Sequence, residues 1–171
     1  MFKPLVLISL TVLLSSCANP SITNIQPAAL ALHSAAPIYI ARFEGNPDFV
    51  EEATALFVAQ LQTKTQHKII QGDAVRTEGP DILRGGNIPS RQMGIANAKA
   101  AGAKLLIVGK VTSHHTGGMM NGFVTIHLID VGTGNLVGTI HRPSRLLIAY
   151  SDHQCVLAAA KSVANALGKN L

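Results

Sequence analysis

The chain has 171 residues, of which 47% are hydrophobic and 13% are charged, and its net charge is +5. This length suits one domain with a core of its own. Basic residues are spread along the chain and there is no tryptophan. Because nucleic-acid-binding surfaces need a basic stripe, the composition argues against nucleic acid as a partner.

The first 17 residues have the layout of a bacterial lipoprotein signal. Lys3 supplies a basic start, residues 5–14 are uncharged and mostly apolar, and small residues then lead into Cys17 in a Leu-x-x-Cys pattern. The apolar stretch is shorter than the roughly 20 residues of a transmembrane helix, and is typical of a secretory signal. We predict that residues 1–16 are a signal peptide and that Cys17 becomes the lipidated start of the mature chain. The alternative is an ordinary signal peptide with an accidental cysteine.

The residue after this cysteine bears on location. Ala18 follows Cys17. An Asp at this position would resemble the signal that retains enteric lipoproteins in the inner membrane. We therefore expect an anchor in the inner leaflet of the outer membrane and a domain that faces the periplasm. Several acyl chains hold a protein durably. Loss of Lys3 with the signal leaves a net charge of +4.

Cys155 is the second cysteine of the chain. With Cys17 lipidated it has no partner for an internal disulfide. We expect a buried, apolar thiol, and an intermolecular disulfide is the alternative.

Residues 17–36 are predicted to be the lipidated cysteine and a tether. Alanine and serine dominate this segment and prolines interrupt it, which favours an irregular, flexible connection. The apolar run 28–32 has the alternative of docking as a short helix.

The first half of the domain reads as strand, helix, strand. Residues 37–43 are predicted to be a strand. Asp48 is a suitable helix N-cap with Glu51 as its capping-box partner, and apolar residues at helical spacing continue to about Lys64. Residues 67–71 are predicted to be a second strand.

The middle of the chain contains a long loop and a second helix. Residues 72–89 contain four glycines and two prolines without periodicity, and loops of this length are usually functional or mobile. Ser90 is predicted to cap a helix that continues to Ala101 and stops at Gly102. Residues 104–112 are the strongest strand signal, a nearly continuous apolar run typical of a central strand covered on both faces.

The last part is predicted to be a β-meander followed by a helix. The segments are a turn region at 116–122, a strand at 123–131, a tight turn at 132–135, a strand at 136–141, a further strand or strand extension at 145–150, and a helix capped by Ser151 and ended by Gly168. The order β-α-β-α-β-β-β-α predicts an α/β (α+β) fold in which helices pack on a mixed sheet. We expect one domain over residues 37–171.

Two stretches carry a resemblance to a known family. The first is residues 102–111 (GAKLLIVGKV) and the second is residues 128–137 (LIDVGTGNLV). They resemble the lipoproteins related to the curli secretion channel CsgG and the amino-terminal domain of TolB. In those families a helix ending in Gly-Ala leads into a strand that finishes with Gly, and a hairpin turns on Asp-x-x-Thr-Gly. The resemblance covers residues 37–168.

The resemblance implies a function through protein contacts. Its fold group includes a secretion pore, the exopolysaccharide-export ring PelC and the peptidoglycan-synthase activator LpoB. We therefore expect a non-enzymatic outer-membrane lipoprotein that is a structural or assembly component of an envelope export, secretion or appendage machine. Its expected partners are envelope proteins, with self-association as one way of assembling. The alternatives are an LpoB-like regulatory module and a lipoprotein that binds a small ligand or metal.

One local cluster of metal-ligand types stands out. His114 and His115 lie near Met119 and Met120, and imidazole and thioether groups suit copper or nickel. Adjacent strand residues point to opposite faces, however. We therefore predict no metal site and no cofactor, with metal binding by the 113–121 hairpin as the alternative.

The other polar motifs have plain structural explanations. Ser, Asp and His at 151–153 are contiguous, whereas a catalytic triad needs converging geometry, so capping explains them better. Residues 84–86 (RGG) lack the strand-to-helix context of a phosphate loop. Asp130 suits a turn. We find no catalytic constellation and expect no enzymatic activity, although a hydrolase is a further alternative.

Overall fold

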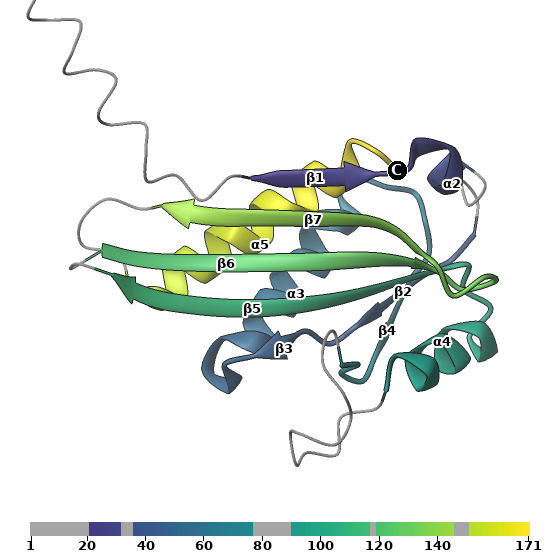
Figure 1. Ribbon diagram of the computed structural model, residues 1–171, viewed down its shortest axis with the longest axis horizontal. Helices are drawn as coiled ribbons and strands as arrows, with labels where there is room; N and C mark the ends of the chain where they lie inside the picture. Colours follow the sequence, from purple (N-terminus) through teal and green to yellow (C-terminus); the bar gives the residue numbers. More distant parts are fainter. Residues whose placement is uncertain (1–20, 32–35, 77–89, 117–118, 146–150) are drawn as a thin grey trace, which may run out of the picture.

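The computed structural model describes residues 21–31, 36–76, 90–116, 119–145 and 151–171, which form one mixed sheet with helices packed on it (Figure 1). The elements in chain order are β1 (Ile22–Ile25), α2 (Pro27–Ala31), β2 (Ile38–Ala41), β3 (Glu44–Gly45), α3 (Pro47–Gln62), β4 (Ile69–Gly72), α4 (Arg91–Ala100), β5 (Leu105–Thr116), β6 (Met119–Asp130), β7 (Leu136–Arg145) and α5 (Asp152–Gly168).

The sheet combines a parallel and an antiparallel part. Its order is β1-β7-β6-β5-β2-β4, and the short β3 also pairs with β5. β2 runs parallel to β4 and β5, whereas β5, β6 and β7 form an antiparallel meander that β1 extends. The predicted mixed α/β fold is confirmed.

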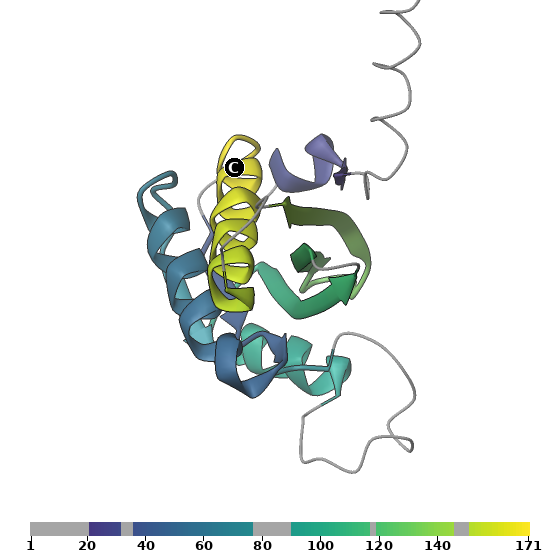
Figure 2. The same ribbon diagram turned by 90° about the vertical axis from the view of Figure 1, so that its left-hand side faces the viewer.

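Helices lie on both faces of the sheet (Figure 2). α3 and α5 pack over the larger core, which includes Leu105 and Ile107 of β5. On the other face, Leu106 and Val108 of the same strand pack with residues of α4. This alternation confirms that the apolar run of β5 is a central strand covered on both faces.

The N-terminal segment departs from the sequence prediction. The tether predicted for residues 17–36 is wrong for residues 22–31. β1 pairs with β7 along its whole length, and Leu30 of α2 is 4% exposed within the larger core. The short-helix alternative for residues 28–32 agrees with α2. The described part of the domain therefore starts with β1 rather than at residue 37.

The cap of α3 also differs from the prediction. Asp48 is not the N-cap, because Asn46 takes that position and its side chain accepts a hydrogen bond of 3.0 Å from the Asp48 amide. Pro47 then opens the helix, where its missing N–H costs nothing. Glu51 forms no capping box and instead pairs with Arg42 at 2.5 Å.

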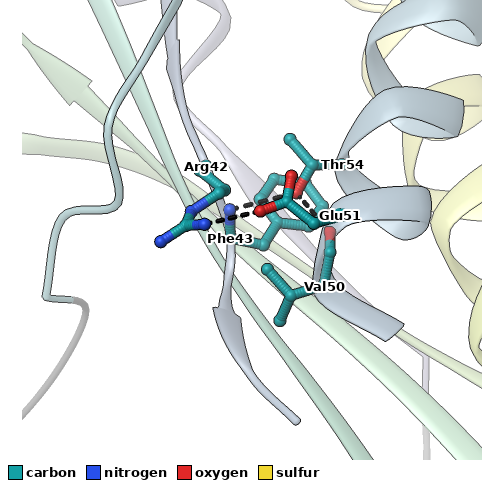
Figure 3. Close-up of polar contacts among 5 residues, drawn as sticks. All are labelled: Arg42, Phe43, Val50, Glu51 and Thr54. Atoms are coloured by element: carbon teal, nitrogen blue, oxygen red, sulfur yellow. Dashed lines mark hydrogen bonds and ion pairs between the residues drawn. The ribbon is translucent and has the colours of Figure 1, made fainter. Parts of the chain in front are cut away.

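A buried hydroxyl and a surface ion pair join the end of β2 to α3 (Figure 3). Thr54 Oγ1 donates to the Val50 carbonyl at 2.7 Å and accepts from the Phe43 amide at 3.1 Å. The ion pair between Arg42 and Glu51 is solvent-exposed. It therefore adds little stability. The hydroxyl satisfies a backbone donor that would otherwise be buried without a partner.

The β5–β6 hairpin is longer than predicted. β6 begins at Met119, so residues 121 and 122 belong to a strand and not to the expected turn. A Cβ atom on Gly122 would lie 2.5 Å from backbone atoms of Cys155 and Val156. The glycine therefore serves a close approach of α5 to the sheet rather than a reversal of the chain.

The predicted turn at 132–135 is confirmed. Asp130 Oδ1 accepts hydrogen bonds from the amide and hydroxyl of Thr133 at 2.6 and 2.8 Å, and Gly134 has a φ of +71°. Ser151 caps α5 as predicted, in a capping box with Gln154. β7 extends to Arg145, and residues 146–150 lie outside the described residues.

The second predicted helix is confirmed as α4. Ser90 accepts a bond from the Met93 amide at 3.3 Å, and Gly102 has a φ of +73°. Of the predicted loop 72–89, residues 77–89 lie outside the described residues. In the described part of the chain, no helix is long and apolar enough to cross a membrane.

Candidate functional site

One face of the β-meander carries polar and aromatic side chains that solvent reaches. Strand alternation and register bring them together on the side of the sheet opposite α5. We call this surface the open face, and it consists of Lys110, Thr112, His114, Phe123, Thr125, His127, Thr139 and His141. All except Phe123 are half-exposed or exposed. The face continues the surface that α4 covers at the start of β5.

Three rings contact one another along the open face. The Phe123 ring lies between two imidazoles, with centroid distances of 5.6 Å to His114 and 5.8 Å to His141. The second pair is stacked, with an interplanar angle of 18°. Phe123 is only 8% exposed. The imidazoles therefore cover an apolar ring and present their polar atoms outward.

Two cross-strand hydrogen bonds hold the imidazoles of His127 and His141. Thr125 Oγ1 lies 2.8 Å from His141 Nδ1, and His127 Nδ1 lies 3.1 Å from Thr139 Oγ1. Burial, and secondarily the charge of Arg142, hold the pKa of His141 below its usual 6.5. His141 is therefore neutral at pH 7. The open face can donate and accept hydrogen bonds there without an imidazolium at this position.

His114 and His115 are neighbours in β5, and adjacent positions of a strand face opposite sides of the sheet. His114 belongs to the open face and contacts Phe123. His115 is paired with Met120 in the β5–β6 register, and Thr116 with Met119. In the part of the chain that the structure describes, no group of three or more His, Cys, Asp and Glu side chains could hold a metal ion.

The remaining residues named from the sequence have structural places or lie outside the description. Cys155 is a fully buried thiol, as expected. His153 does not join Ser151 in a triad, because its Nε2 contacts Glu52 Oε2 of α3 at 2.5 Å. Cys17 and residues 84–86 lie outside the described residues.

The pairing that builds the open face is not predicted from the sequence. The predicted strand at 123–131 contains His127 but gives it no partner across the sheet. The register shifts between Leu128 and Ile129, which pair with Gly138 and Leu136. This bulge moves every later pair by one residue and sets His127 opposite Thr139. The predicted strand at 123–131 agrees with β6, but nothing in the sequence marks the bulge.

Exposed apolar side chains do not form a second surface. Among the described residues, the large exposed apolar side chains are Ile22, Met93 and Leu136, from β1, α4 and β7. Single exposed apolar residues are normal on a protein surface. The open face is therefore the more distinctive candidate for contact with another molecule.

Comparison with known proteins identifies the fold. No protein-family model matches the chain, and no curated protein matches it in sequence. Its structure is similar to a PelC dodecamer subunit from Paraburkholderia phytofirmans, with a TM-score of 0.60 and 16% identity over 90% of this chain and 98% of that chain. A variant PelC dodecamer gives a TM-score of 0.54 and 13% identity over 76% and 87% of the two chains.

The LpoB C-terminal domain from Salmonella enterica is more distantly similar, with a TM-score of 0.46 and 13% identity over 72% of this chain and 96% of that chain. The two PelC matches, both above a TM-score of 0.5, show that the chain has a mixed α/β fold of known type. More particularly, it has the fold of the PelC subunit. The relation to CsgG-related lipoproteins stays a prediction.

Proposed function

We propose that this chain is a non-enzymatic lipoprotein of the bacterial outer membrane that assembles with copies of itself in an envelope export, secretion or appendage machine. The observation that carries the proposal is the fold match to PelC over 98% of the PelC chain. PelC is a dodecamer in that structure. A chain that has nearly all of that subunit's architecture is suited to the same kind of assembly.

The anchor follows from the N-terminal sequence. A lipid on Cys17 would hold the chain in the inner leaflet, and the domain would face the periplasm. β1 begins at Ile22, only five residues later. In this arrangement the domain lies close to the membrane, where anchored copies are concentrated and meet in a common orientation.

The open face is our proposed contact surface between copies. It combines half-exposed hydroxyls and imidazoles around a covered phenylalanine ring. Non-obligate protein interfaces have such mixed polar and aromatic surfaces. A ring needs two different complementary patches on each subunit, and the open face would supply one of them.

Fractionation and cross-linking in intact membranes test this function. The full chain is expected in the outer-membrane fraction, where a lysine-reactive cross-linker yields a ladder of oligomers. Cys17→Ser should leave the outer membrane. Thr139→Arg should shorten the ladder, because a charged side chain would project from the open face, whereas Gln62→Arg on α3 adds the same charge elsewhere and should not.

Different failures have different meanings. A wild-type chain absent from the outer membrane would contradict the anchor. A membrane-bound chain without any ladder would contradict self-assembly and favour the LpoB-like regulatory module. A ladder that Thr139→Arg leaves unchanged would exclude the open face as the contact.

A further inference from the structure

A basic groove lies along the outer side of α5, beside β7. It is a hollow of about 380 Å³, and its charged lining consists of Arg142, Lys161 and Lys169. Ser162 and Asn165 lie between the two lysines, and the rest of the lining is alanine. We call this hollow the basic groove. It lies on the α5 side of the sheet, whereas the open face is on the other.

The elements that build the groove carry almost no acidic residues. Its lining comes from β7 and α5, and β1 contacts Arg142. The only acidic residue in these three elements is Asp152, at the far end of α5. Lys161, Asn165 and Lys169 follow one another at intervals of four residues, so they share one side of the helix. Neither lysine forms an ion pair within the described residues. The positive charge of the groove is therefore not neutralised by a neighbouring carboxylate.

Arg142 ties the groove to the beginning of β1. Its Nη1 donates to the Ile22 carbonyl at 3.0 Å, and its Nη2 donates to Thr23 Oγ1 at 2.5 Å. The Arg142 guanidinium is therefore held at the first two residues of β1. Figure 1 shows α5 running behind β6 and β7 with its C-terminal end toward α2. Lys161 and Lys169 belong to the C-terminal half of α5 and its cap.

The distance to the membrane has an upper limit set by chain length. Ile22 lies five positions after Cys17, so their Cα atoms are at most about 18 Å apart in any conformation. If Cys17 carries lipid, the beginning of β1 and the guanidinium bound to it lie within that distance of the anchored residue. Headgroups at the membrane surface are then the nearest abundant anions to the groove.

We propose that the basic groove binds the phosphate headgroup of an anionic membrane lipid and so seats the domain on the membrane by its β1 side. The inference rests on the proposed lipid anchor at Cys17. Three cations with a hydroxyl and an amide between them suit a phosphate diester, which accepts charge-assisted hydrogen bonds. Basic pockets near membrane surfaces recognise anionic headgroups in this way.

Lysine reactivity in vesicles tests the proposal. The lipidated mature protein is added to vesicles of phosphatidylcholine alone or with phosphatidylglycerol, treated with an amine-acylating reagent and analysed by mass spectrometry. We expect acylation of Lys161 and Lys169 to slow about fivefold with phosphatidylglycerol, the effect of one cation–headgroup contact. Lys99 and Lys104, exposed on the α4 side, should change less than twofold.

Variants separate the groove from general attraction to the membrane. Asn165→Glu puts a negative charge into the groove and should abolish the protection. Gln92→Glu makes the same charge change on the exposed side of α4 and should preserve it. Arg142→Gln should weaken the protection, and its unfolding curve shows whether β1 has stayed in place.

The other possible outcomes distinguish a lipid headgroup from a free anion, and a failed groove from a failed anchor. Equal protection in both vesicle types would mean simple coverage by the membrane and overturn the proposal. Protection by inorganic phosphate in neutral vesicles would show a free-anion site and overturn the lipid assignment. The intact mass reports the lipid on Cys17, so unprotected lysines in a lipidated chain refute the groove alone. A chain without lipid refutes both this inference and the anchor.

Discussion

At the scale of single residues, Gly109 sets how closely Phe43 packs on β5. A Cβ atom at position 109 would lie 2.3 Å from Phe43 Cδ1. Phe43 is fully buried and its ring lies 5.1 Å from that of Phe57, so it has no room to retreat. Gly109→Ala should lower the free energy of unfolding by about 2 kcal/mol, measured by urea denaturation.

A second substitution checks the cause of that loss. Phe43→Leu removes the ring atoms that meet the new methyl group. The double variant should therefore lose less stability than the sum of the two single variants. Additive losses, or a Gly109→Ala variant as stable as the wild type, would contradict the packing described for this contact.

His141 makes a pH-dependent contribution to stability. Its folded pKa lies below 6.5, through burial first and Arg142 second. Between the folded pKa and the unfolded value near 6.5, the unfolded chain binds a proton that the folded chain does not. The stabilisation is complete above about pH 6.5 and is lost as the pH falls through the folded pKa.

The measurement is urea unfolding at a series of pH values from about 7 to about 5, the range in which a histidine with a lowered pKa titrates. Wild-type stability should fall more steeply than that of His141→Gln, which keeps a polar partner for Thr125 but does not titrate. Parallel curves for the two proteins would show that His141 has the same pKa in the folded and unfolded states.

At the scale of secondary-structure elements, α2 and β1 distinguish a docked segment from a tether. Leu30 is 4% exposed in the larger core, whereas Ile22 in the same segment is 48% exposed. Leu30→Ala should cost about 2–3 kcal/mol of stability. Ile22→Ala, the matched control, should change stability by no more than about 0.5 kcal/mol. A tether would leave both variants as stable as the wild type.

The sequence could predict the elements that have a buried apolar pattern or a capping residue. The apolar periodicity of α3 and α5, the apolar run of β5, and the caps Ser90 and Ser151 all led to correct elements. β1 left no such signal. It is an edge strand with mostly exposed side chains, and backbone hydrogen bonds to β7 hold it. Backbone hydrogen bonds between β1 and β7 leave no trace in a pattern of hydrophobic residues.

The open face was only partly predictable for a related reason. Asp130, Thr133 and Gly134 correctly indicated the β6–β7 turn, and a strand was predicted on each side of it. A regular register from that turn would set Thr125 opposite Ile140, whereas the bulge sets it opposite His141. The bulge lies at Val137, between the partners of Leu128 and Ile129, and the side chain of Val137 is buried.

At the scale of the whole molecule, the two faces of the sheet divide the proposed tasks. The open face would meet a neighbouring copy, while the basic groove and β1 on the α5 side would meet the membrane. Both surfaces draw on β7, which contributes His141 to the open face and Arg142 to the basic groove. This division is a property of the assembled domain, since the residues of each surface come from at least two separate segments of the chain.

The mass of the lipidated protein, extracted in mild detergent and measured by light scattering and native mass spectrometry across concentrations, tests the proposed self-assembly most directly. We predict one discrete oligomer of several subunits whose mass does not drift with concentration, because a closed ring has a fixed subunit number. A monomer at every concentration would contradict the account.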